Sequence, residues 1–414
     1  MKPAPSPLLA KLRTGDWLDR RRIALLAAIL LAIELVFFAF IVAGTHGWIV
    51  PLDEPCTTDF VSFYAAGALA DAGTPALAYD QAAHLAAEEA IVAPGIQYQF
   101  FFYPPVYLLL CAVLARLPYL VAFITFAAAS LFAYLAVARR ILDDTSGTAL
   151  LVLVAFPAVF WNIGLGQNAF LSAALLGGAT LLVDRRPVVS GILFGALCYK
   201  PHFGLLIPLA LIAAGRWRAV AGAGATVAAL VIAAVAFYGI DTWRDYVTAS
   251  AAAPAMYGSG RILFAGFVRP FGAIRLVGGG VALAYAVQGA MTAVGAALVW
   301  TVWRRNLSLP LRAATLASAT LVAVPLALLY DLMIGAVAVA WLVRDDAPAP
   351  PWEKTVLAVL VLALVDARNL AEEFHLPVTS LAALALFVLV ARRVFAELGW
   401  AALPFMPASP ARFR

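Results

Sequence analysis

The chain is strongly apolar, so the few polar residues inside or beside its apolar runs are the first candidates for chemistry. Asp59 is the first candidate that we consider, in the stretch Thr58-Asp59-Phe60. A carboxylate at this place has two interpretations. It can cap the helix predicted to follow it, or it can act as a general base that takes a proton from a sugar or lipid hydroxyl.

Lys200 and His202 lie in the middle of the long apolar stretch 188–214. A lysine about twelve residues from the ends of an apolar run cannot easily extend its ammonium group to the membrane surface. It therefore needs a buried partner, which is either a phosphate whose developing charge it stabilises or a carboxylate of another segment, such as Asp331. His202 by itself is more typical of a core histidine.

The remaining candidate residues lie at breaks between apolar runs. Gln167 and Asn168 follow a glycine, and Tyr103 precedes a pair of prolines, so turn chemistry alone explains these three positions. Five other positions are candidates for binding substrate or for a structural role: Tyr64 in the predicted helix after Asp59, Arg261 and Arg269 as phosphate contacts or headgroup anchors, and Tyr330 with Asp331, which orient substrate or cap the next helix.

The composition indicates an integral membrane protein. Of 414 residues, 64% are hydrophobic and 12% are charged, and the mean hydropathy is +0.94. A soluble domain has about twice that charged fraction. The net charge of +5 forms no stripe interleaved with aromatic residues, so we expect no nucleic-acid partner. The sequence contains no recognisable nucleotide-binding, hydrolase or metal-binding motif, and we expect neither a cofactor nor a metal.

We expect an all-α, polytopic bundle of about 11–12 membrane helices that forms a single membrane domain over 1–414. The clearest spans are 23–44, 119–138, 148–164, 168–183, 219–239, 281–303, 312–329, 332–343, 355–371 and 378–395. Two stretches are ambiguous: 104–116 is short for a span, and Pro201 makes 188–214 either a kinked helix or two half-helices.

The charges of the loops predict on which side of the membrane each loop lies. Residues 1–22, the N-terminal lead, contain six Lys/Arg and two Asp, so we expect the lead to be cytoplasmic. The loop 45–103 contains seven acids and no Lys or Arg, so we expect it to be external. Two short amphipathic helices are predicted on the membrane surface within this loop, at 62–72 and 81–92, and 240–280 is a second external loop. If 104–116 does not span and 188–214 is broken, Gln167 and Lys200 lie outside with Asp59, and Arg139, Arg185 and Arg216 lie inside. The other arrangement places Arg139 and Arg185 outside.

The order of several motifs resembles that of glycosyltransferase family 87, a group with a GT-C-type fold. This family includes α-mannosyltransferases that depend on polyprenol-phosphate-mannose. The matching stretches are Asp59-Phe60 with Tyr64-Ala65-Ala66-Gly67, Gly73-Thr74-Pro75, Ala78-Tyr79-Asp80, Tyr103-Pro104-Pro105, Gly166-Gln167-Asn168, Gly191, Gly195 and Lys200-Pro201, and Arg216-Trp217-Arg218. They cover about residues 57–218.

The resemblance implies that a sugar, with mannose favoured, is transferred with inversion from a polyprenyl-phosphate-sugar donor to a lipid or glycan acceptor. Membrane lipids are the other expected partners. The resemblance also implies that Asp59 is the base. We expect an integral protein of a bacterial plasma membrane with an extracytoplasmic active site. The chain departs from the mycobacterial members in having no histidine near 322–331.

Other functions stay open at this point. A flippase for lipid-linked sugars would have a polar path through the bundle and often inverted repeats, and no such repeat is detectable. A polymerase or ligase of lipid-linked glycans would carry a large late loop, whereas the largest loop here is early and acidic. A non-catalytic assembly subunit is the third alternative.

Overall fold

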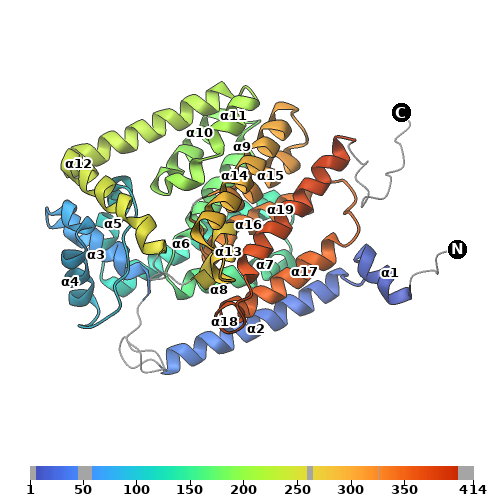
Figure 1. Ribbon diagram of the computed structural model, residues 1–414, viewed down its shortest axis with the longest axis horizontal. Coiled ribbons are helices and arrows are strands. Elements are labelled where there is room, and N and C mark those ends of the chain that lie inside the picture. Colours follow the sequence, from blue (N-terminus) through green and yellow to red (C-terminus); the bar gives the residue numbers. More distant parts are fainter. Residues whose placement is uncertain (1–5, 45–57, 259–263, 325, 400–414) are drawn as a thin grey trace.

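The computed structural model describes residues 6–44, 58–258, 264–324 and 326–399. Within these ranges the chain forms helices joined by short loops, with one isolated bridge between Phe267 and Leu328, so the predicted all-α bundle is confirmed. Figure 1 shows α1 and the start of α2 on the right and α3 and α4 on the left, with the longer helices running between these two ends.

In the part of the chain that the structure describes, five helices are long and apolar enough to cross a membrane: α2 (Arg20–Gly44), α6 (Tyr119–Leu142), α12 (Trp217–Gly258, up to Ala251), α14 (Val281–Arg304) and α19 (Val378–Glu397). A bent pair of shorter helices over 147–164 makes a sixth if it forms one span. In the first four helices, between 11% and 22% of the most apolar stretch is buried inside the protein, which leaves most of the helix surface for lipid. Fewer helices therefore meet this criterion than the 11–12 expected.

Shorter apolar helices fill the space between these five. They are α3 (Phe60–Asp71), α5 (Pro105–Ala115), α9 (Ala169–Leu182), α10 (Pro187–Ala196), α11 (Ile207–Ala213), α15 (Leu309–Ala323) and α16 (Met333–Arg344). Helix α15 is buried from Leu311 to Ala323 and forms the centre of the core. Five further helices are α1 (Pro7–Thr14), α4 (Gln81–Ile91), α13 (Pro270–Leu276), α17 (Glu353–Ala363) and α18 (Ala367–Phe374).

The expected span 148–164 is divided into α7 (Gly147–Val154) and α8 (Pro157–Gly164), which are bent by 54°. Pro157 explains the break, because its ring has no N–H and collides with the carbonyl one turn earlier. The stretch 188–214 is also broken, between α10 and α11, and Lys200 and Pro201 lie at that break. Helix α5 has 11 residues, so the stretch 104–116 is short, as its sequence indicates.

Two parts of the expected loops differ from the prediction. Helix α3 does not lie on the surface, because most of its residues are buried and it packs closely on α5, where Gly67 meets the backbone of Cys111. The expected loop 240–280 begins with helix, since α12 continues to Gly258 beyond a kink at Gly239, whose φ of 78° glycine adopts readily.

The arginine clusters gather at one end of the bundle, here called the basic end. Asp184, which follows α9, forms ion pairs with Arg216 before α12 and with Arg312 in α15. Arg344, at the end of α16, donates to the carbonyl of Arg140 at the end of α6 at 3.2 Å. Arg20 of α2 pairs with Asp144 at 3.1 Å, which places the N-terminal lead at the same end.

Candidate functional site

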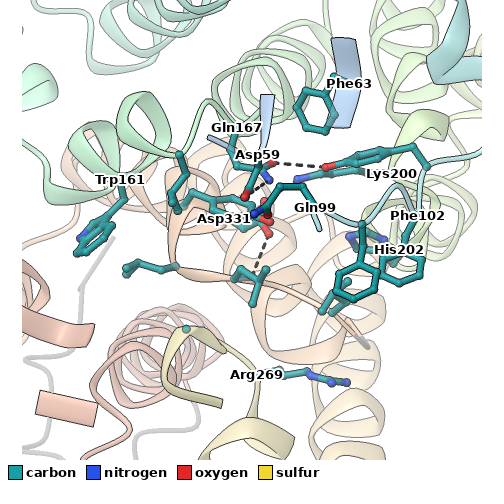
Figure 2. A pocket seen from close by; sticks show the side chains of 18 of the residues that line it. Asp59, Phe63, Gln99, Phe102, Trp161, Gln167, Lys200, His202, Arg269 and Asp331 are labelled. Carbon is teal, nitrogen blue, oxygen red and sulfur yellow. Dashed lines mark hydrogen bonds and ion pairs between the residues drawn. The ribbon is translucent and has the colours of Figure 1, made fainter. Parts of the chain in front are cut away.

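A cavity of about 670 Å³ opens at the opposite end of the bundle, here called the cavity end. Its walls come from segments far apart in the sequence: Asp59 before α3, the irregular segment 97–103, the turn after α8, the break 199–202, the loop 326–331, and parts of α12 and α18. This volume suits a small ligand or the headgroup of a larger one. Figure 2 shows several of its polar side chains converging around Asp59.

Asp59 occupies the N-cap position of α3, but its side chain makes no capping hydrogen bond. Its Oδ2 instead accepts a hydrogen bond of 2.6 Å from Nε2 of Gln167. Phe60 and Phe63 anchor the start of the helix in the core, and Thr58 lies 3.3 Å from the hydroxyl of Tyr119 in α6. The capping interpretation of this carboxylate therefore fails, and the side chain is directed at a cavity.

The surroundings of Asp59 make it a stronger base than an ordinary aspartate. Burial, partly offset by the Gln167 hydrogen bond and the Lys200 charge, raises the pKa of its carboxyl to about 6. A carboxyl with this pKa is deprotonated at neutral pH and still has substantial affinity for a proton. These are the properties that a general base needs.

Gln167 is held from both sides. The hydroxyl of Tyr103 donates to its Oε1 at 3.4 Å, which leaves Nε2 to donate to Asp59. Gln167 and Tyr103, both sequence candidates, line the cavity. Asn168 lies behind them instead, fully buried, and donates to the hydroxyl of Tyr107 at 3.2 Å.

Lys200 and Asp331 form a buried ion pair with Nζ and Oδ1 2.9 Å apart. Each side chain is 4% exposed, and both residues line the cavity. The Lys200 ammonium also lies over the rings of Phe203 and Tyr330, 5.3 Å and 5.2 Å from their centroids. The structural partner considered for Lys200 is thus present, and the lysine still faces the space that Asp59 faces.

Asp331 has a second task, because its Oδ2 accepts from the backbone N–H of Leu328 at 3.0 Å and fixes the turn before α16. Tyr330 beside it lines the cavity. His202 and Arg269 contribute to another part of the wall. Arg269 is buried between the rings of Phe267 and Phe271, and Figure 2 shows it apart from the Asp59 cluster.

Of the sequence candidates that the structure describes, Asn168 and Tyr64 do not line the cavity. Tyr64 points away from it, and its hydroxyl donates to the carbonyl of Leu117 at 2.7 Å, which ties α3 to the loop before α6. Arg261 lies outside the described residues. Among the residues that the structure does describe, no group of three or more His, Cys, Asp or Glu side chains is arranged to hold a metal ion.

Sequence reasoning missed several parts of the cavity wall, three of which are discussed here. One is the segment Gln97–Phe102, whose alternating amides and aromatic rings were a visible signal. Another is Trp161 with Leu165, and the third is Arg368 with Glu372 on α18, joined by an ion pair of 2.8 Å. The last two carried no local signal, because only the fold brings them to the cavity.

The model of glycosyltransferase family 87 matches residues 101–330 of the chain, which is more than half of it. The match includes Tyr103, Gln167, Lys200 and Tyr330 and begins after Asp59. No curated protein and no solved structure matches the chain.

Proposed function

Because the chain belongs to glycosyltransferase family 87, we propose that it transfers a sugar from a polyprenyl-phosphate donor to a lipid or glycan acceptor at its cavity end, with mannose the favoured sugar. Membership makes it a membrane glycosyltransferase. The observation that carries the finer proposal is the pairing across one cavity of Asp59, a carboxylate held by an amide, with Lys200, a buried cation.

The proposed reaction is a single displacement. The acceptor hydroxyl oxygen attacks the anomeric carbon of the donor while Asp59 takes the hydroxyl proton. A new bond forms between that carbon and the acceptor oxygen, and the bond to the phosphate oxygen breaks. The polyprenyl phosphate departs as an anion, and Lys200 stabilises the charge that develops on it. Attack from the side opposite the phosphate inverts the anomeric centre.

The contacts of Lys200 support its proposed role in binding the phosphate. The Asp331 carboxylate lies 2.9 Å from the Lys200 ammonium and balances its charge. A lysine ammonium has three N–H donors, and the bond to Asp331 uses one of them. The ammonium is thereby oriented in advance, which lowers the cost of reorganisation when a phosphate arrives. Arg269 and His202, farther along the same wall, are proposed to contact the donor headgroup.

The distribution of charge supports an extracytoplasmic site. Arg140, Arg216, Arg312 and Arg344 meet at the basic end, and cytoplasmic segments carry an excess of Lys and Arg. The cavity opens at the other end. A reporter that is active only outside the cytoplasm should be active when fused at Ala87 and silent at Arg305. Cytoplasmic behaviour of the Ala87 fusion would contradict the proposed face.

The proposed activity is tested by incubating the purified full-length protein with a set of radiolabelled polyprenyl-phosphate sugars and a membrane lipid and glycan extract. We expect label from one donor, with mannose the first choice, to move to a lipid or glycan product. The matched control is Asp59→Asn. The proposal fails if no donor is consumed by the wild-type protein while each one binds to it.

A further inference from the structure

One wall of the cavity is an irregular segment, Gln97–Tyr103, in which aromatic rings face the open space. Tyr98, Phe100 and Phe102 all line the cavity, whereas Phe101 between them is buried in the core. The rings of Phe100 and Phe102 have centroids 5.3 Å apart and planes 11° from parallel. Tyr98 meets Phe100 edge-on, at 4.8 Å and 71°. We call the Phe100 and Phe102 pair the aromatic shelf.

The shelf is fixed from behind. The backbone N–H of Gln99 donates to Oε2 of the buried Glu88 at 3.0 Å. The hydroxyl of Tyr79 donates to the carbonyl of Tyr103 at 2.9 Å. Phe101 packs on the ring of His84, with centroids 5.9 Å apart. A wall anchored at three points presents its rings without a large ordering cost on binding.

Two amide side chains accompany the rings. Gln97 and Gln99 line the same wall, and Nε2 of Gln99 donates to the carbonyl of Gln97 at 3.2 Å. An amide both donates and accepts hydrogen bonds, as a sugar hydroxyl does. The rings of Phe100 and Phe102 stack on each other, and an outer face of such a stack offers a negative π face to the slightly positive C–H groups on one side of a sugar ring. Amides beside flat rings therefore match the two kinds of surface that a saccharide has.

The opposite wall has a different character. Trp161 and Leu165 line it from the end of α8, and Leu329 belongs to the turn that contacts α8. Trp161 belongs to α8, which contacts the membrane-spanning α2 through Phe160 and Phe37, with ring centroids 5.8 Å apart. This wall suits an isoprenoid chain that continues into lipid. Figure 2 shows Trp161 and Phe102 on opposite sides of Asp331, so the two walls flank the polar cluster.

From this division the geometry points to Gln97–Tyr103 as an acceptor subsite that takes a saccharide ring. The acceptor is then a glycan or a glycolipid and not a bare lipid alcohol. That the bound saccharide is the acceptor rests on the proposed function. That the ligand is a saccharide rests on the aromatic shelf itself. The donor tail leaves along the Trp161 wall, and the acceptor ring stacks on one outer face of the Phe100 and Phe102 pair with its hydroxyls toward Gln97 and Gln99.

The test measures binding separately from transfer. The full-length protein in nanodiscs is titrated with mannotriose, maltotriose and arabinotriose, and binding is followed by saturation-transfer difference NMR on the sugar ring protons. We expect at least one trisaccharide to bind. In the double variant Phe100→Leu with Phe102→Leu, its affinity should fall about tenfold, because apolar volume is kept and the flat faces are lost.

Three controls accompany this variant. Phe100→Tyr with Phe102→Tyr keeps the flat rings and should keep the affinity. Phe132→Leu changes a phenylalanine that is 75% exposed on α6, away from the cavity, and should have no effect. Gln97→Leu, at an exposed position, should weaken the saccharide several-fold. Farnesyl phosphate, a probe for the donor wall, should bind the wild type and the Leu double variant equally.

The inference is overturned if no trisaccharide binds, if binding is unchanged in the Leu double variant, or if farnesyl phosphate loses as much affinity as the sugar. Failure of the subsite and failure of the proposed function give different results. Sugar transfer that persists without ring-dependent saccharide binding removes the subsite alone. Ring-dependent saccharide binding by a protein that consumes no polyprenyl-phosphate sugar removes the proposed function and keeps a saccharide site.

Discussion

The basic end and the cavity end both hold buried ionic side chains, but they satisfy them differently. At the basic end, Arg393 bonds to Asp345 at 2.9 Å and also to Glu353, with all three side chains at most 7% exposed. Asp184 is likewise shared between two arginines. At the cavity end, Asp59 accepts a hydrogen bond from the amide of Gln167, and Lys200 forms an ion pair with one carboxylate, that of Asp331.

This difference separates two uses of buried charge. A guanidinium held by two carboxylates has little capacity left for another ligand, so such pairs join helices to one another. A carboxylate held by a neutral amide keeps its affinity for a proton, and an ammonium with one carboxylate retains donors for an anion. The cavity end is therefore the end equipped for proton transfer and for binding a phosphate.

The largest effect short of losing the base is expected at Lys200. Lys200→Met should lower turnover by about 10²–10³-fold, because one preorganised charge contact on the leaving group is lost. It should also cost about 3–5 kcal/mol of stability, since Asp331 is left as an uncompensated buried charge. Turnover of the purified protein and its thermal inactivation midpoint measure the two effects.

A second variant separates the roles of this ion pair. Lys200→Met with Asp331→Asn removes both charges and leaves a side-chain oxygen that can accept from the Leu328 N–H. We expect most of the stability to return while turnover stays low. Recovery of turnover to near the wild-type value would mean that Lys200 serves only as a structural partner of Asp331.

An intermediate effect is expected at Gln167, where substitution should change the pH dependence of turnover. Its hydrogen bond lowers the pKa of Asp59, which burial has raised to about 6. Gln167→Met removes the bond, so the Asp59 pKa rises further, by about one unit. A general base acts when deprotonated, so the acid limb of the turnover profile should move to higher pH, with about a tenfold loss well below pH 6 and little change near pH 9.

Gln167→Glu is the matched comparison, because it keeps the shape and places a second carboxyl beside Asp59. It should move the acid limb farther in the same direction. A purely structural role for Gln167 predicts lower activity at every pH with an unmoved limb, and that outcome would contradict its role in positioning the base.

The smallest effect on turnover is expected at the basic end. Arg393→Met leaves Asp345 and Glu353 buried without their cation and should cost about 3–5 kcal/mol of stability. Turnover per folded molecule should stay within about twofold of the wild type, because this ion cluster lies far from the cavity. A tenfold loss in molecules that remain folded would show that the two ends do not have separate tasks.

Local sequence signals predicted the parts of the fold that local chemistry determines. Pro201 indicated the break that brings Lys200 to the cavity, and the arginine clusters indicated which helix ends lie together. The pairing of Lys200 with Asp331 was one of two open alternatives. The hydrogen bond between Asp59 and Gln167 was not predictable, because 108 positions separate the two residues and only the packing of the helices brings them together.

Other features followed from tertiary contacts that no window of sequence contains. Helix α3 is buried because it packs against α5 through Gly67, although its sequence resembled a surface helix. Helix α12 continues past Gly239, where a loop was expected. Arg368 and Glu372 reach the cavity because α18 lies beside it, and neither residue has a motif around it.

The most direct test of the account is the turnover of purified, folded Asp59→Asn, with donor binding measured on the same sample. The substitution keeps the shape of the side chain and removes its basicity, and general-base assistance is worth about 10²–10⁴-fold. We predict that donor affinity is retained and that turnover falls at least a hundredfold. Turnover above about a tenth of the wild-type value, with the donor bound normally, would contradict the assignment of Asp59 as the base.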